Sequence, residues 1–315
     1  MKFHPDSIDA VVDLLEHNQL TYGCSVIIGD NSSGKSMLVK QLIEKRKDKN
    51  SIYFIDAVNR GFDVTKVSKN TEKPPFKGTI LKTRLNESYF NIQDSFNCYG
   101  TLTERIEQIY TVFEKEVQRL FQELVNDEFE ILYGNLVGEV QFKEGRGLLS
   151  SGYQAIIRLL LELTYYNEMC QGETSDMCVV IDELDEFLSP RYAAKILGFL
   201  RQKFQRFEFV ITTHSIDLVI AAQDANIVIL DTNGYEIIDA NDYNSYTEVQ
   251  RLFQRVFGKQ EVDIADVEDI LRRLLNNKIN GAWSEVDERK MQELQKETLS
   301  ASQRLVYRQI MEAVR

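Results

Sequence analysis

The sequence predicts an α/β fold in which a mostly parallel sheet is flanked by helices. Short apolar runs that are typical of buried strands recur before residue 232, at 25–28, 51–56, 177–181, 207–212 and 227–231. Segments with helical spacing of apolar residues separate most of these runs. Strands that alternate with helices favour parallel pairing, because parallel neighbours need a long crossover connection.

The other elements follow from the same patterns. Residues 7–17 read as an amphipathic helix, and a second helix is expected from Lys35 to about Arg46. Residues 57–77 are polar and contain Pro74-Pro75, which indicates a loop. We also expect a strand at 78–85, a helix at 102–126, two short strands within 131–142, a helix opening at 150, and helices at 193–204 and 215–222.

The character of the chain changes near residue 244. We expect one large domain over residues 1–244, with an insertion at about 57–142. Residues 245–315 hold no strong strand, and they predict charged helices at 262–275, 284–296 and 300–314. This region is expected to contact a partner or a second copy of the chain.

Composition describes a globular protein with a sizeable core. The 315 residues are 43% hydrophobic and 27% charged, and no run approaches the roughly 20 apolar residues of a membrane span. Acidic residues interrupt the first twenty positions, which is unlike a signal peptide. The four cysteines have no metal-site spacing, so we expect reduced thiols and a cytoplasmic protein without a membrane partner.

Charge is distributed unevenly along the chain. The net charge is −12, yet residues 40–84 carry twelve Lys and Arg against five Asp and Glu. Such a basic stretch can mark a nucleic-acid face. We favour a solvated helix end at Lys45, Arg46, Lys47 and Lys49, because no aromatic residues are interleaved at stacking spacing, and nucleic acid stays open as a partner.

A phosphate-binding motif organises the first half of the chain. Glycines let such a loop curl so that its N–H groups form a nest for an anion, and the helix that follows adds its positive amino end. Lys35 can reach the β- and γ-phosphates, and the Ser36 hydroxyl can ligate Mg²⁺. A strand before and a helix after are the context that this motif needs. The motif G-x-x-x-x-G-K-S consists of Gly29, Asp30, Asn31, Ser32, Ser33, Gly34, Lys35 and Ser36.

A second motif ends a buried strand with carboxylates. Residues 178–183 read C-V-V-I-D-E, a Walker B pattern. Asp182 can hold Mg²⁺ directly or through water together with Ser36, and Glu183 can orient and deprotonate an attacking water. Acidic residues at a strand end are common, so this pattern alone is weak evidence for a nucleotide site. It becomes strong evidence together with the phosphate-binding motif upstream.

Two shorter motifs complete the set. Residues 149–154 read L-S-S-G-Y-Q at a helix start, where Ser150 and Gly152 can form an anion site and Ser150 can equally be a helix cap. Residues 209–215 read F-V-I-T-T-H-S, which puts His214 just after a core strand. A lone histidine is more often structural, but its place after the strand that follows Walker B favours a functional role.

The four motifs occur along the chain in the order 29–36, 149–154, 178–183 and 209–215. In that order they resemble the motifs of the ATP-binding-cassette ATPases. Within that superfamily the chain is most similar to the non-transporter branch of SMC-like, recombination-repair and OLD-type (overcoming lysogenization defect) ATPases. The similarity covers about residues 22–232 and includes V-V-I-D-E-L-D-E-F-L-S-P after the Walker B strand. It implies a P-loop NTPase fold and ATP with Mg²⁺ as ligands.

The resemblance also implies roles for individual residues. Two heads would close head to tail, so that Ser150 and Gly152 contact the γ-phosphate of the nucleotide held by the partner's loop. Glu183 would be the general base, and His214 would sense the γ-phosphate. Asp185 would lie at the dimer interface, and Gln93, in F-N-I-Q-D, is the candidate for the Q-loop residue near the metal.

The chain departs from the family pattern in three places. The signature is L-S-S-G-Y-Q rather than L-S-G-G-Q, and Ser189 stands where the OLD-like group has histidine. A helix precedes the phosphate-binding strand where the family has an antiparallel strand pair with an adenine-stacking aromatic. Tyr22 is the nearby aromatic candidate, so the choice of ATP over GTP rests on the family alone.

These motifs lead to competing hypotheses of function. The first is an ATPase switch in anti-phage defence or DNA repair that acts on a separate effector such as a nuclease or toxin, because the chain has no visible nuclease centre. The second is a nucleotide-dependent scaffold in which hydrolysis is incidental, and Glu183→Gln would separate it from the first. A transporter ATPase subunit is disfavoured by the residues after Walker B.

Overall fold

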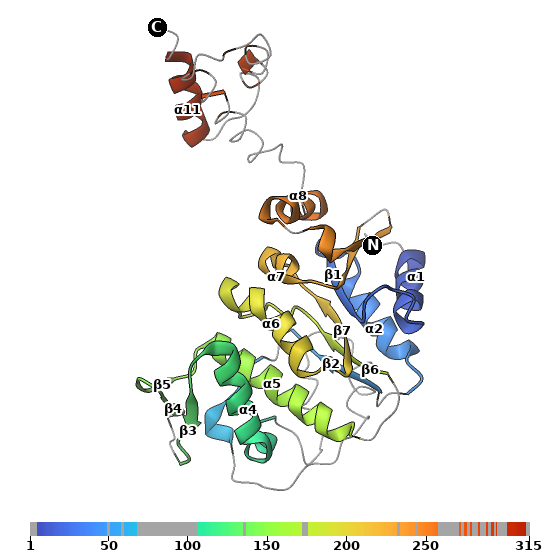
Figure 1. Cartoon of the computed structure of the whole chain (residues 1–315), viewed down its shortest axis with the longest axis vertical. Coiled ribbons are helices and arrows are strands. Elements are labelled where there is room, and N and C mark those ends of the chain that lie inside the picture. Colours follow the sequence, from blue (N-terminus) through green and yellow to red (C-terminus); the bar gives the residue numbers. More distant parts are fainter. Residues whose placement is uncertain are drawn as a thin grey trace. The chain divides into compact units, whose positions relative to one another are not determined.

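Figure 1 presents the computed structural model of the chain. Its contacts divide the chain into two compact units, Met1–Phe257 and Gly258–Arg315. The structure describes residues 5–48, 51–57, 60–67, 106–134, 137–171, 176–231, 234–243 and 245–257, the helix at 301–312 and single positions between 271 and 294. The strand expected at 78–85 and Gln93 lie outside these residues.

A six-stranded sheet forms the centre of the first unit. Its strands are β1 (Cys24–Gly29), β2 (Ile52–Ile55), β6 (Met177–Ile181), β7 (Phe207–Thr212), β8 (Asn226–Leu230) and β9 (Tyr235–Asp239). They lie in the order β2-β6-β7-β1-β8-β9, and every neighbouring pair is parallel except β8 and β9. The predicted mostly parallel α/β fold is confirmed.

Helices cover both faces of this sheet (Figure 1). α1 (Pro5–Glu16) and α2 (Lys35–Lys45) pack on one face, and their apolar side chains share a core with Ile27 of β1. Val26 and Ile28 point into the opposite core, because successive strand residues alternate between faces. That core is completed by α4 (Tyr110–Val125), α5 (Ser151–Met169), α6 (Pro190–Lys203) and α7 (Ile216–Ala221).

Burial on both faces explains why the sequence revealed the central strands. All residues of β1, β2, β6 and β8 are buried, so these strands read as continuous apolar runs. The strands that the sequence did not predict are more exposed. β9 has no buried residue among its five, and neither does β5 (Gly145–Leu148) among its four.

A small antiparallel sheet lies outside the central one. It has the order β3-β4-β5, with β3 at Phe129–Ile131 and β4 at Glu139–Phe142. Two short strands were expected within 131–142, whereas the structure has three over a longer span. The helix expected at 102–126 is α4, preceded by a 3₁₀ turn at Ile106–Ile109, and it ends at Asn126 with a positive φ of 62°.

One further helix belongs to the first unit. α8 (Tyr246–Phe257) was not predicted, and it buries Val249, Leu252 and Phe253 in the core that contains α7. The structure therefore divides the chain after Phe257, later than the expected boundary at 244. In the second unit α11 (Ala301–Glu312) lies within the helix expected at 300–314, and Leu271, Leu274, Met291, Leu294 and Ile310 form a separate core.

Candidate functional site

The turn between β1 and α2 has the backbone that a phosphate-binding loop requires. Gly34 caps α2 with a φ of 104°, and Ser32 also has a positive φ, of 69°. A Cβ on Gly29 would lie 2.5 Å from both the Leu230 carbonyl oxygen and the Ser33 hydroxyl. The loop can therefore hold this course only with glycine at position 29.

Lys35 folds back across its own loop. Its Nζ donates hydrogen bonds to the carbonyl oxygens of Gly29, at 2.7 Å, and Asp30, at 3.3 Å. The side chain is 8% exposed, and burial lowers the pKa of the ammonium, while Asp182, Glu183 and Asp30 act in the opposite direction. The ammonium thus lies inside the loop, within the electrostatic influence of three carboxylates.

The loop fits an anionic ligand on a second ground. The Ser33 hydroxyl is buried and has no hydrogen-bond partner among the described residues. A buried polar atom without a partner is costly, and a ligand oxygen would remove that cost. Together with the N–H groups at the start of α2, Ser33 makes the loop suitable for a phosphate.

Asp182 begins the segment after β6 and is held from three directions. Its N–H donates to the Ile55 carbonyl, at 2.9 Å, and its carboxylate accepts a 2.6 Å hydrogen bond from Thr212. Its carbonyl accepts a 2.7 Å hydrogen bond from Nη2 of Arg60. The carboxylate is 4% exposed, so strand β6 delivers a fixed acid at the sheet edge.

Glu183 follows in a strained backbone conformation with a φ of 48°. Its N–H donates to the Thr212 hydroxyl at 2.7 Å, so one hydroxyl fixes both acids. Burial raises the pKa of the Glu183 carboxyl, and the neighbouring Asp182 adds to this effect. Its Oε1 lies 3.9 Å from Nε2 of His214, whose own pKa is lowered by burial and by Lys35.

Thr213, directly before His214, holds the segment that follows strand β6. The Thr213 hydroxyl donates to the carboxylate of Asp185 and accepts from the Ser215 N–H at 2.9 Å. Because β6, β7 and β1 are consecutive in the sheet, their carboxyl ends bring Lys35, Asp182 and His214 to one place. Of the residues around this site, sequence reasoning gave no role to Thr212, Thr213 or Arg60.

Ser150 and Gly152 are not joined to this cluster. Ser150 caps α5 by accepting a 3.2 Å hydrogen bond from the Tyr153 N–H, as one of the two interpretations expected. A Cβ on Gly152 would lie 3.0 Å from the carbonyl oxygen of Phe187, in the segment after Walker B. Within the described residues no hydrogen bond or ion pair connects Ser150 or Gly152 to residues 29–36.

The donor set suits Mg²⁺ better than a transition metal. No group of three or more His, Cys, Asp or Glu side chains with metal-ligand geometry occurs in the part of the chain that the structure describes. Mg²⁺ in nucleotide sites takes one or two protein oxygens together with phosphates and waters. Ser36, the second residue of α2, and Asp182 are the oxygen donors that this arrangement offers.

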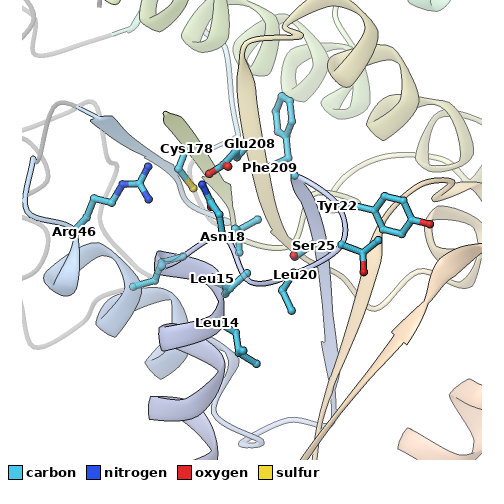
Figure 2. Close-up of a pocket in the computed structure, with 14 residues that line it drawn as sticks. Leu14, Leu15, Asn18, Leu20, Tyr22, Ser25, Arg46, Cys178, Glu208 and Phe209 are labelled. Atoms are coloured by element: carbon cyan, nitrogen blue, oxygen red, sulfur yellow. The ribbon is translucent and has the colours of Figure 1, made fainter. Parts of the chain in front are cut away.

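A separate cavity lies at the opposite ends of these strands. A cavity of about 130 Å³ opens at the amino ends of β1, β6 and β7, lined by Leu15, Arg46 and Glu208 among others (Figure 2). Tyr22 lines this cavity, and its hydroxyl donates to Asp239 at 2.8 Å. Tyr22, the aromatic candidate for stacking on the base, thus lies before β1, whereas the phosphate loop follows β1.

The basic cluster at the end of α2 makes structural contacts. Lys45 pairs with Asp13 of α1. Arg46 is 9% exposed, and its guanidinium contacts Glu16 at 3.4 Å and donates to the Asp176 carbonyl at 2.6 Å. Lys45 thus belongs to an exposed helix end, as expected. Arg46 does not, because its guanidinium is buried in contacts with α1 and with the residue before β6.

Two curated proteins are similar to part of the chain. The Septu protein PtuA of Bacillus thuringiensis is 26% identical over 147 residues, which are 44% of this chain and 33% of that protein. The Septu protein PtuA of Bacillus mycoides is 26% identical over 137 residues, 41% of this chain and 19% of that protein. The chain thus matches only a third or less of these relatives' length. No protein-family profile matches the chain.

Solved structures of SMC heads give weaker matches. The SMC head domain from Thermotoga maritima aligns with a TM-score of 0.36 at 17% identity, over 69% of this chain and 89% of that one. An Smc head bound to the C-terminal domain of ScpA, from Pyrococcus furiosus, aligns with a TM-score of 0.30 at 12% identity, over 46% and 38%. The α/β architecture is given by the strand order β2-β6-β7-β1-β8-β9 itself. In the described part of the chain no helix is long and apolar enough to cross a membrane.

Proposed function

We propose that the chain is an ATPase that closes head to tail around ATP as a homodimer and controls a separate effector. The observation that carries this proposal is the meeting of Lys35, Asp182, Glu183 and His214 at the carboxyl ends of three adjacent strands. A buried cation, a fixed acid, a carboxyl of raised pKa and an imidazole are the groups that phosphoryl transfer to water needs.

Residues 29–36 bind the phosphates in this proposal. The N–H groups of the loop, the Ser33 hydroxyl and the Lys35 ammonium bind phosphate oxygens, and Lys35 exchanges its carbonyl partners for them. Ser36 and Asp182 hold Mg²⁺, which when bound neutralises charge on the phosphates. The Thr212 hydroxyl keeps the Asp182 carboxylate in one orientation for this task.

Glu183 orients the attacking water and accepts its proton. A carboxyl whose pKa is raised by burial is a better proton acceptor than an ordinary one, provided that it is ionised at the working pH. His214 lies beside Glu183, with Nε2 3.9 Å from its Oε1, and in this proposal it contacts the γ-phosphate. Its lowered pKa keeps the imidazole neutral near pH 7, so it can donate one hydrogen bond without competing for the proton.

The second copy completes the site in this proposal. Ser150 is exposed, and Gly152 is half-buried beside Phe187, so both can reach a nucleotide held by another chain. Asp185, bound to Thr213, lies on the same segment and reaches the dimer interface. ATP then closes the pair, and hydrolysis opens it, because only the triphosphate contacts both chains.

The biological setting is part of the proposal. The motif resemblance favours a role in anti-phage defence or DNA repair. The similarity to the two Septu proteins PtuA supports a place for the chain among proteins related to PtuA. The effector is a separate nuclease or toxin, bound by residues 245–315 or the 57–77 loop, and nucleic acid is a further partner to test. The setting is the cytoplasm.

A single comparison of variants tests the switch. Wild type should hydrolyse ATP and become a dimer with ATP in light scattering, and Lys35→Ala should do neither because the loop loses its cation. Glu183→Gln should still dimerise with ATP but hydrolyse it roughly 10²- to 10⁴-fold more slowly, because the base is absent. Lys40→Ala, at a half-buried position of α2 where the lysine pairs with Glu44, is the matched control and should behave as wild type.

Two outcomes would contradict the proposal. ATP-dependent dimers of Lys35→Ala would rule out the sandwich. Full biological activity of Glu183→Gln would favour the scaffold hypothesis, since turnover would then be dispensable.

A further inference from the structure

The last turn of α8 contacts the histidine of the nucleotide site. The ring centroids of Phe257 and His214 lie 5.4 Å apart, with an angle of 50° between the rings. Phe257 in turn packs on Phe253 at 5.0 Å, and Phe253 is buried in the core of the first unit. A continuous aromatic contact therefore leads from the core, through Phe257, to the imidazole.

His214 has few other groups to fix its side chain. It follows β7 in a loop, and its side chain is 34% exposed. Its remaining neighbours are charged. Glu183 lies 3.9 Å from Nε2, Lys35 lowers the pKa of the imidazole, and Asp185, Asp182 and Asp30 raise it. Charges at these distances bias the protonation state of the ring, whereas van der Waals contact with an aromatic face restricts how the ring turns.

We propose that Phe257 is a positioning residue for His214, which holds the imidazole beside Glu183 and shields it from water. This inference rests on the proposed ATPase function. Phe257 touches neither nucleotide nor metal in that proposal, so it acts through the histidine alone. The sequence gives no hint of this role, because the two residues are far apart in the chain and Phe257 belongs to no motif.

The position of Phe257 adds a consequence for coupling. It is the last residue of α8 and of the first unit, and the chain continues from it directly into Gly258. Because the two rings are in contact, a change in the position of His214 on nucleotide binding would act first on the end of α8. The same contact thus provides a route by which the nucleotide state reaches the segment that leads to the C-terminal unit.

Histidine titration by NMR in the full-length chain tests the contact without any nucleotide. The chain has three histidines, His4, His17 and His214, and the spectrum of His214→Gln assigns the third. Burial is the main cause of the lowered pKa of His214, so Phe257→Ala should move that pKa upward, toward the ordinary value for histidine. Phe257→Trp should leave it near wild type, as should Leu252→Val, a control at a buried position of the same helix outside the aromatic contact.

Kinetics then separate a positioning role from a general structural one. Phe257→Ala should lower kcat roughly tenfold, with KM within about twofold of wild type, because only the orientation of the histidine is lost. Phe257→Tyr should restore the rate. An effect on KM alone, or an equal loss of kcat in Leu252→Val, would overturn the inference.

Two further results keep the outcomes distinct. Superimposable His214 titrations in wild type and Phe257→Ala would overturn the positioning role even if the chain hydrolyses ATP. A wild-type chain in which the pKa of His214 is lowered as expected, but which does not hydrolyse ATP, would instead refute the proposed function. Should Phe257→Ala fail to fold, ring-to-ring nuclear Overhauser contacts in wild type decide the matter, and their absence overturns the inference.

Discussion

At the scale of single residues, Arg60 is the unexpected member of the site. Its side chain is 1% exposed, and Nη2 donates to the carbonyl oxygen of Asp182 at 2.7 Å. Nε and Nη1 have no hydrogen-bond partner among the described residues. Burial lowers the pKa of the guanidinium, and the buried Asp56 is the largest opposing influence. Buried polar atoms without partners are costly, so the hydrogen bond to the Asp182 carbonyl and the charge of Asp56 have to offset that cost.

Arg60→Met should lower the free energy of unfolding by about 3 kcal/mol, because it leaves Asp56 and the Asp182 carbonyl without their cation. Arg60→Lys retains the charge and should lose less. Urea denaturation measures both, and Arg251→Met, at an exposed position of α8, should stay within about 0.5 kcal/mol of wild type. An Arg60→Met chain as stable as wild type would mean that Arg60 is merely tolerated.

The difference between Arg60 and Lys35 explains which site residues a sequence reveals. Lys35, Asp182, Glu183 and His214 lie in local motifs whose spacing carries the chemistry, so the sequence predicts that they gather. Arg60 lies in a polar loop, and its partner is 122 positions away. Its burial arises from tertiary contact alone, and no local pattern encodes it.

At the scale of elements, the loop between β1 and α2 depends on one glycine. Gly29→Ala would place a methyl group 2.5 Å from the Leu230 carbonyl and the Ser33 hydroxyl, so the backbone has to shift. We expect a loss of about 1–3 kcal/mol in the free energy of unfolding and weaker binding of a fluorescent ATP analogue. Both follow from displacing the loop from its close contact with β8.

Gly198→Ala is the matched control for this prediction. Gly198 lies in the interior of α6, where an added Cβ meets nothing within 4 Å. The substitution should stabilise the chain by roughly 0.5–1 kcal/mol and leave nucleotide binding unchanged. If Gly29→Ala and Gly198→Ala change the free energy of unfolding and nucleotide binding equally, the loop accommodates the added methyl group at position 29 without loss of stability.

Elements were predictable in proportion to their burial. Strands β1, β2, β6 and β8 have no exposed face, so continuous hydrophobic runs in the sequence predict them. β9 pairs only at the sheet edge, and its residues are exposed or half-buried, which leaves no alternating pattern. The short strands of the small sheet carry the same weak signal.

At the scale of the whole molecule, the boundary between the two units depends on α8. The sequence predicts a boundary near residue 244, because no strong strand follows and the expected helices there are rich in charges. The amphipathic face of α8 instead closes the core of the first unit. The unit that carries the nucleotide site therefore ends at Phe257.

Two truncated chains test this boundary. A chain of residues 1–257 should unfold in one cooperative transition and retain ATP binding, because it keeps the whole core. A chain of residues 1–244 exposes the surfaces that Val249, Leu252 and Phe253 cover, at about 1.5–3 kcal/mol for each side chain. It should therefore be less stable by on the order of 5 kcal/mol, enough to unfold many domains. Leu252→Ala in the full-length chain should reproduce about 2–5 kcal/mol of that loss without shortening the chain. Equal urea midpoints for the two truncated chains would instead assign α8 to the C-terminal unit.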